Sequence, residues 1–251
     1  YLLREEDDFL LNADDFLSAC TEDIDLVIIC NPNNPTSSAI QTGDMERIIR
    51  ECKKRNIFVM IDETYVEFAP CIEEITAIPL TKRYDNLMVI RGVSKFYAAP
   101  GLRFGYGITS SEAFLKSLHQ HQNPWSLNSV GAYTGELMLK DTDYFRETRA
   151  LILSERERMF ARLSHMGGYK PYAAYGNFIL VRILKEGLTS FDVFEAAIKN
   201  RLMIRDCSSF ESLTGEYIRF CIMNPEDNDR LLHVLNLSLI HISEPTRLAL
   251  I

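Results

Sequence analysis

Residues 24–36 read IDLVIICNPNNPT, an apolar run that stops at a cluster of asparagine and proline. A short continuous apolar run is typical of a strand buried on both faces of a parallel sheet, and asparagine and proline favour turns. The stretch Gly43–Asn56, whose apolar residues have helical spacing, follows this first strand. Further apolar runs of the same kind are Ile57–Ile61, Leu87–Arg91 and Phe104–Ile108. The alternation of strand and helix predicts an α/β fold with a mostly parallel sheet.

Three polar residues closely follow these predicted strands. Asn34 lies in the turn after the first strand, Asp62 directly follows the second, and Lys95 stands shortly after the third. In parallel α/β sheets, ligands bind beyond the carboxyl ends of the strands. We therefore expect Asn34, Asp62 and Lys95 to line one crevice.

The chain changes character beyond Gly135. A long charged helix is predicted over Asp143–Met166. Shorter elements typical of a smaller α+β unit follow, namely strands at Asn177–Ile183, Leu202–Arg205 and Tyr217–Met223, a helix at Ser190–Asn200 and a closing helix from Pro225. We expect part of a large domain at residues 1–145 and a small domain, including the connecting helix, at residues 146–236.

The two ends of the chain have unusual sequences. The first residue is Tyr1 rather than methionine, without a signal-peptide pattern, so we expect a fragment that begins inside a longer protein. The last stretch, residues 237–251 (LSLIHISEPTRLALI), resembles the translation of a sequencing adapter. We treat it as a non-native tail and leave it out of the fold prediction.

Composition excludes several classes of function. The net charge of −8 argues against a nucleic-acid partner, because phosphate backbones are bound by surplus lysine and arginine. No apolar run is long enough for a membrane span. The six cysteines have no CxxC spacing, and His119 and His121 lack a second pair of metal ligands. We expect buried thiols, no metal site and a cytoplasmic location.

Three motifs in this order resemble those of the class I/II (fold-type I) aminotransferases, enzymes that depend on pyridoxal 5′-phosphate (PLP). They are NPNNPT at residues 31–36, DETY at residues 62–65 and SKFYAAPGLRFGYG at residues 94–107. The resemblance implies PLP as cofactor. It also implies the PLP-dependent transferase fold, in which a mostly parallel large-domain sheet is joined to a smaller α+β C-terminal domain.

The resemblance also implies a role for each matching residue. Lys95 would be the catalytic lysine that holds PLP as a Schiff base, and Asp62 would pair with the pyridinium nitrogen. The other residues it implies are Asn34 and Tyr65 at the ring hydroxyl, Arg103 at the cofactor phosphate and Arg219 at the substrate carboxylate. Protonation of the ring nitrogen matters because the ring must accept electrons.

Each of these signals has a simpler explanation when it is taken alone. NPNNP is compatible with an ordinary turn, and Asp62 with a helix cap. Lys95, Arg103 and Arg219 are compatible with exposed or salt-bridged cations. Their occurrence together, in order and at strand ends, favours the cofactor site.

One position departs from the family pattern. Family members usually have serine or threonine three residues before the lysine, where the hydroxyl binds the cofactor phosphate. This chain has Gly92 there. Ser94 or a group of a partner subunit would then have to replace that donor.

Within the family, the closest resemblance is to the histidinol-phosphate aminotransferase group and, inside it, to threonine-phosphate decarboxylases of cobalamin biosynthesis. It rests on KFYAAPGLR at 95–103, PWSLN at 124–128, IRDCSSF at 204–210 and YIR at 217–219. Arg205 then becomes a candidate for the substrate phosphate, since a guanidinium suits bidentate anion contacts. A strand-end arginine paired with Asp206 or a neighbouring carboxylate is the alternative.

We favour decarboxylation of L-threonine O-3-phosphate to aminopropanol phosphate. The alternative is a histidinol-phosphate-type aminotransferase that uses 2-oxoglutarate, and Arg219 suits both reactions. A third hypothesis is a transcription regulator that uses PLP as a sensor, although the acidic charge disfavours it. The family also implies a homodimer for the full-length protein.

Overall fold

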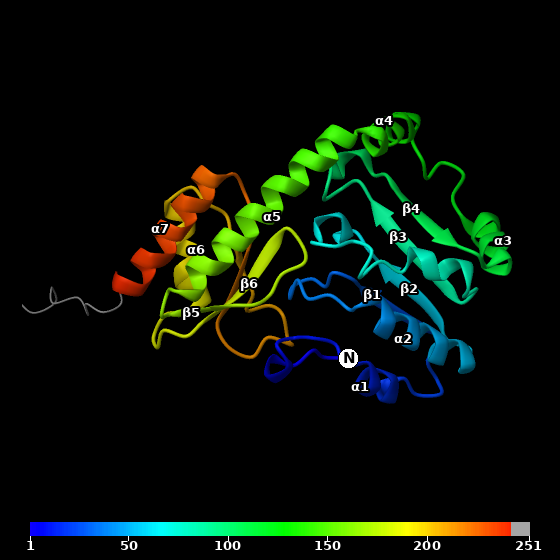
Figure 1. Ribbon diagram of the computed structural model, residues 1–251, viewed down its shortest axis with the longest axis horizontal. Helices are drawn as coiled ribbons and strands as arrows, with labels where there is room; N and C mark the ends of the chain where they lie inside the picture. Colours follow the sequence, from blue (N-terminus) through cyan, green and yellow to red (C-terminus); the bar gives the residue numbers. More distant parts are fainter. Residues whose placement is uncertain (242–251) are drawn as a thin grey trace, which may run out of the picture. The chain divides into compact units, whose positions relative to one another are not determined.

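The computed structural model describes residues 1–241, which form two compact units (Figure 1). The first unit consists of Tyr1, Leu10–Asn34 and Ser38–Arg149. The second consists of Leu2–Phe9, Pro35–Ser37 and the chain from Ala150 onward. Each unit has its own four-stranded sheet.

The sheet of the first unit has the order β1-β2-β3-β4. Its strands are β1 (Leu26–Cys30), β2 (Phe58–Asp62), β3 (Leu87–Gly92) and β4 (Gly105–Thr109). The first three are parallel and β4 is antiparallel to β3. The loop before β4 holds only a short 3-10 turn, and a parallel return would need a longer crossover. The α/β fold with a mostly parallel sheet is confirmed.

Helices pack on both faces of this sheet. On one face, the cross-strand row Ile29, Ile61 and Val89 packs into a core with α1 (Ala13–Ala19) and α2 (Thr42–Lys54). On the other face, Phe58 of β2 stacks on Phe114 of α3 at 4.6 Å between ring centroids. The remaining helices of the unit are α3 (Glu112–His121) and α4 (Ser129–Lys140), with 3-10 turns at Val66–Phe68, Ile78–Lys82 and Pro100–Leu102.

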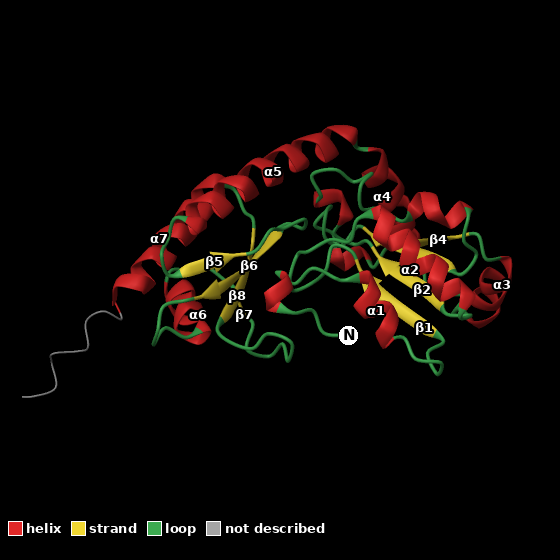
Figure 2. Ribbon diagram, turned by 60° about the horizontal axis from the view of Figure 1, so that its bottom comes forward, coloured by secondary structure: helices red, strands yellow, loops and turns green. Residues whose placement is uncertain are grey.

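The second unit has an antiparallel sheet of order β5-β6-β8-β7 (Figure 2). Its strands are β5 (Tyr169–Pro171), β6 (Phe178–Ile183), β7 (Arg205–Asp206) and β8 (Tyr217–Cys221). Helix α5 (Thr142–Ser164) begins in the first unit and continues into the second. The other elements are α6 (Ser190–Lys199), α7 (Pro225–His241) and a 3-10 turn at Glu5–Asp7.

Helix α7 continues past residue 236. It runs to His241, and within it Ser238 is buried and donates a hydrogen bond from its hydroxyl to the carbonyl of Val234. The first residues of the predicted non-native tail therefore belong to the last helix of the second unit. Residues 242–251 of that tail lie outside the described residues.

Three of the six cysteines, Cys20, Cys52 and Cys207, are buried, while Cys30 and Cys221 are exposed. All six are free thiols. Within residues 1–241, no group of histidine, cysteine or carboxylate side chains is arranged to hold a metal ion. None of the described helices has the length and apolar character required to cross a membrane.

Asn31 fixes the turn that follows β1. Its side chain is fully buried and bonds three backbone groups. Its amide nitrogen donates to the carbonyls of Ile40 and Ile75 at 3.1 and 2.9 Å, and its oxygen accepts from the N–H of Ile40 at 2.8 Å. The NPNNP segment is thus held by a side chain that replaces regular backbone pairing.

We expect Asn31→Ala to lower the free energy of unfolding by about 2–4 kcal/mol, because it leaves buried backbone groups without partners. Urea unfolding of the purified protein measures this change. Asn123→Ala, in an exposed loop, is the control and should change stability by less than about 0.5 kcal/mol. Equal stabilities of the two variants would contradict this role of Asn31.

Candidate active site

Asp62 ends β2 and points one carboxylate oxygen at Thr64. Its Oδ1 accepts hydrogen bonds from the N–H of Thr64 at 2.9 Å and from the Thr64 hydroxyl. Among the described residues, Oδ2 accepts no hydrogen bond. Asp62 pairs in register with Cys30 of β1. The half-buried carboxylate is therefore held from one side and available on the other.

Lys95 lies beside Tyr65. The ammonium nitrogen stands 5.7 Å from the centroid of the Tyr65 ring, close enough for a cation–π contact. Tyr65 precedes the 3-10 turn that follows β2, and Lys95 follows the end of β3. Lys95 is exposed and forms no ion pair with any residue in the described part of the chain. The structure therefore brings together two of the residues singled out in the sequence.

Asn34 and Arg103 are both exposed and lie in loops beyond strand ends. Asn34 comes four residues after the end of β1. Arg103 lies in the loop between β3 and β4, where it adopts a left-handed backbone with φ of 53°. Its guanidinium donates to the carbonyl of Pro100 at 2.9 Å, and no carboxylate within residues 1–241 pairs with it. Both loops leave the same edge of the sheet, because β1, β2 and β3 are parallel.

Gly92 faces Gly105 across β3 and β4. A Cβ atom at residue 92 would lie 3.3 Å from the carbonyl oxygen of Phe104, and one at residue 105 would lie 3.0 Å from that of Arg91. The close approach of the two strands accounts for glycine at the position where the family usually has a hydroxyl. A serine at residue 92 would require the β4 backbone to shift.

Arg205 and Arg219 lie directly opposite each other on β7 and β8 of the second unit. Both line a cavity of about 560 Å³. The other residues that line it are Phe191, Phe194, Met203, Ile204, Asp206, Ser208, Ser209, Phe220 and Cys221. Two guanidinium groups on neighbouring strands give this cavity a positive character suited to anions.

The alternative role of Arg205, an ion pair with Asp206, is absent from the described residues. Arg205 instead donates to the hydroxyl of Ser209 at 2.6 Å and lies over the ring of Phe210. Asp206 accepts from Ser190 at 2.9 Å and from the Ser208 backbone at 2.9 Å. As far as the described residues show, the Arg205 guanidinium therefore keeps most of its donors available for a ligand.

Sequence reasoning missed three buried or half-buried charges next to Asp62, namely Glu63, Glu67 and Arg91. Glu67 is 6% exposed, and its Oε2 has no hydrogen-bond partner. Burial, with a smaller contribution from the nearby Glu63, raises the pKa of Glu67 to about 7, although a backbone hydrogen bond and the cations Arg91 and Arg149 act in the opposite direction. The motif DETYVEF shows two carboxylates four residues apart, but that spacing alone does not indicate burial.

Comparison with known proteins identifies the family. Residues 1–235 match the family model of aminotransferase class I and II, and the chain belongs to this family. Threonine-phosphate decarboxylase of Salmonella typhimurium is 33% identical over 93% of the chain, and histidinol-phosphate aminotransferase of Methanopyrus kandleri is 30% identical over 90%. The chain spans 62% and 56% of the lengths of these two relatives.

Solved structures agree with this assignment. The crystal structure of histidinol-phosphate aminotransferase from Clostridium acetobutylicum superposes with a TM-score of 0.87 at 29% identity, covering 93% of this chain and 69% of that one. The fold of the PLP-dependent transferases predicted from the motifs is therefore confirmed. The family depends on PLP.

The side chains of the first unit fit this cofactor. Among residues 1–241, nothing bonds Asp62 Oδ2, which would accept a hydrogen bond from a donor such as a ring N–H. The Lys95 amine, next to the Tyr65 ring, has no ion-pair partner in the described part of the chain. The Arg103 guanidinium has no carboxylate partner there either, as the binding of a phosphate requires. A carboxylate, an amine and a guanidinium beyond the strand ends are the groups that PLP needs from a protein.

We expect Glu67→Gln to change how stability depends on pH. With its pKa raised from 4.5 to about 7, Glu67 in the folded state keeps a proton that the unfolded state has already released. The free energy of unfolding therefore falls as the pH rises through this window, by about 3 kcal/mol. Glutamine cannot ionise, so the free energy of unfolding of the variant does not fall in this way as the pH rises.

Urea unfolding at pH 4 and pH 8 measures the effect. Wild type and Glu67→Gln should have similar stability at pH 4, and the variant should be more stable at pH 8. Glu147→Gln, an exposed carboxylate on α5, is the control and should give no such divergence. A stability difference that is the same at both pH values would contradict the burial of an ionisable Glu67.

Proposed function

We propose that this chain carries the PLP site of an enzyme that acts on a phosphorylated amino acid or amine. The observation that carries the proposal is the position of the Lys95 ammonium, 5.7 Å from the Tyr65 ring, in segments that follow the parallel strands β3 and β2, with Asp62 at the end of β2. Family membership supports it independently.

When bound, PLP supplies a conjugated ring that accepts the electrons of a bond broken at the substrate Cα. Asp62 would hold a proton on the ring nitrogen through its unpaired Oδ2, because an adjacent carboxylate favours the protonated form. Asn34 and Tyr65 would donate hydrogen bonds to the ring oxygen, and Arg103 would bind the phosphate. The Lys95 amine would bind the cofactor covalently, and after release it would move protons at the substrate Cα.

The cavity of the second unit supports a substrate with two anionic groups. We assign the substrate phosphate to Arg205, together with the Ser209 hydroxyl that it already contacts at 2.6 Å. We assign the substrate carboxylate to Arg219, on the opposite strand. The two guanidinium groups stand on directly paired residues of neighbouring strands, an arrangement that suits a ligand with two anionic groups.

Among the possible reactions, we favour decarboxylation of L-threonine O-3-phosphate to aminopropanol phosphate. The IRDCSSF segment supports this choice, since aminotransferases of the group more often have proline where this chain has Asp206. The two reactions differ in the bond that is broken at the substrate Cα, which would be the bond to the carboxylate in decarboxylation and the bond to hydrogen in transamination. Cobalamin biosynthesis, a cytoplasmic location and a homodimer stay predictions.

We expect Lys95→Ala to abolish the visible absorbance that wild-type protein shows with bound PLP, and to abolish activity. Borohydride treatment followed by peptide mapping should locate the reduced cofactor on Lys95 in the wild type. Lys116→Ala, an exposed lysine on α3, is the control and should behave as wild type. Reduced cofactor attached to a different lysine would overturn the assignment.

The substrate is tested by assaying the purified full-length protein with PLP. Carbon dioxide release from L-threonine O-3-phosphate is expected, and 2-oxoglutarate-dependent transamination of histidinol phosphate would instead support the alternative. Arg205→Met should raise the KM for the phosphorylated substrate by at least about 10-fold, since hydrogen bonds to charged groups contribute about 1.5–3 kcal/mol. Arg162→Met, an exposed arginine on α5 outside the cavity, should leave the KM unchanged. An unchanged KM in Arg205→Met would remove the phosphate role.

A further inference from the structure

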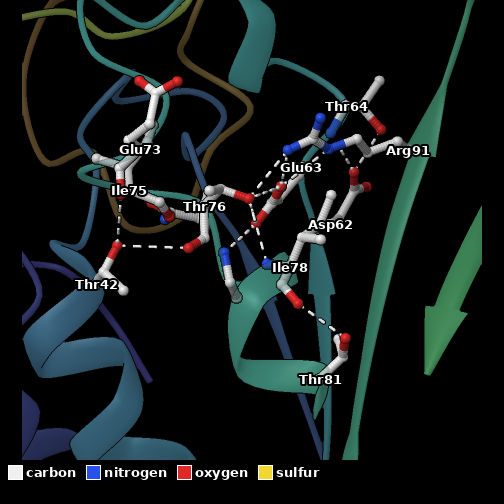
Figure 3. Close-up of polar contacts among 12 residues, drawn as sticks. Thr42, Asp62, Glu63, Thr64, Glu73, Ile75, Thr76, Ile78, Thr81 and Arg91 are labelled. Carbon is white, nitrogen blue, oxygen red and sulfur yellow. Dashed lines mark hydrogen bonds and ion pairs between the residues drawn. The ribbon is translucent and has the colours of Figure 1, made fainter. Parts of the chain in front are cut away.

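The Glu63 carboxylate and the Arg91 guanidinium form an ion pair at the carboxyl ends of β2 and β3 (Figure 3). The Arg91 Nε and Nη2 atoms donate to Glu63 Oε2 at 3.0 and 2.7 Å. The Glu63 side chain is fully buried and that of Arg91 is 14% exposed. This Glu63–Arg91 pair therefore lies away from water, where the strength and direction of a charged contact matter most.

The loop before the 3-10 turn at Ile78–Lys82 completes the bonding of Glu63. The Thr76 hydroxyl lies 2.9 Å from Oε2 and the Ala77 N–H donates to Oε1 at 2.6 Å. Arg91 also donates to the Thr76 hydroxyl at 3.0 Å. Both oxygens of Glu63 are thus occupied, and the carboxylate is fixed by two separate segments of the first unit, the loop at Thr76 and Ala77 and the end of β3.

Stability alone is a weak explanation for such a pair. Removing two charges from water is expensive, and apolar residues of similar volume often stabilise a protein as well as a buried ion pair does. A buried and fully bonded pair instead holds its neighbours in one arrangement. Its place in the chain shows which neighbours these are.

The pair adjoins the proposed cofactor residues on both strands. Glu63 directly follows Asp62, and its N–H continues the ladder by donating to the carbonyl of Ile90 at 2.9 Å. Arg91 directly precedes Gly92, where the chain leaves β3 toward Lys95. Because side chains alternate along an extended chain, Glu63 and Asp62 lie on opposite faces. The pair can therefore hold Asp62 without touching the cofactor.

We propose that Glu63 and Arg91 are positioning residues, which lock the ends of β2 and β3 so that Asp62 and the segment leading to Lys95 keep the spacing that PLP requires. This inference rests on the proposed function. The other ionisable groups around the pair are Glu67 on the turn after β2 and Tyr106, which pairs with Arg91 across β3 and β4. Both are present in every variant used below.

The test distinguishes an effect on the stability of the protein from an effect on the positions of Asp62 and Lys95. Glu63→Gln and Arg91→Met each leave one charge unpaired, and both should lower the melting temperature of the cofactor-free protein. The double variant Glu63→Gln/Arg91→Met removes both charges and should recover most of that loss. For each protein, titration with PLP gives the dissociation constant, and the absorbance of bound PLP is followed against pH.

In the double variant, we expect PLP to bind about 10-fold more weakly than in wild type, an effect of the size that outer-shell partners have at metal sites. We also expect the pH at which the absorbance changes to shift, because Asp62 no longer keeps its place. Wild-type affinity together with a wild-type pH profile would show that the pair is only structural and would overturn the inference. A wild type that fails to bind PLP would overturn the proposed function, and this inference with it.

Thr76 provides a second test with a milder change. Thr76→Val removes the hydroxyl that contacts Glu63 and Arg91 while keeping the shape of the side chain, and Thr76→Ser keeps the hydroxyl. We expect weaker PLP binding and a shifted pH profile in Thr76→Val, and values close to wild type in Thr76→Ser. Equal PLP affinity of the valine and serine variants would count against positioning through this network.

Discussion

The parallel pairing of β1, β2 and β3 is the constraint on which the candidate site depends. It brings the carboxyl ends of three strands to one edge of the sheet, in the register Cys30–Asp62–Ile90. The residues that follow these ends must then share a small space, although they are far apart in sequence. A row of apolar side chains on the opposite face of the sheet fixes this register, because shifting one strand by a residue would expose these side chains to water.

The charged side chains at this edge of the sheet fall into two groups, those that are available for a ligand and those that are paired with each other. On the side proposed for the cofactor, Asp62 keeps an unpaired oxygen and Lys95 has no ion-pair partner among the described residues. Next to them, Glu63 and Arg91 are paired with each other and bonded by Thr76. A rigid, hydrogen-bonded network thus adjoins groups that are left available for a ligand. Binding sites achieve a defined geometry through such supporting networks.

The strand ends and the residues that follow them could be predicted from the sequence, because short apolar runs mark buried parallel strands. The antiparallel direction of β4 could not, since it depends on the absence of a crossover between β3 and β4. Glu63 and Arg91 also escaped prediction. Their burial depends on Thr76 and Ala77, which a loop brings over them, and no local pattern reveals such a contact. Arg205 and Arg219 were found by resemblance, and only the β7–β8 register showed that they are neighbours.

The central claim is that PLP binds at the edge formed by β1, β2 and β3. A crystal structure of the protein with PLP tests it most directly. The account predicts continuous electron density from the Lys95 amine to the cofactor, with Asp62 Oδ2 within hydrogen-bond distance of the ring nitrogen. Cofactor density elsewhere in the protein, or a ring nitrogen with no contact to Asp62, would contradict it.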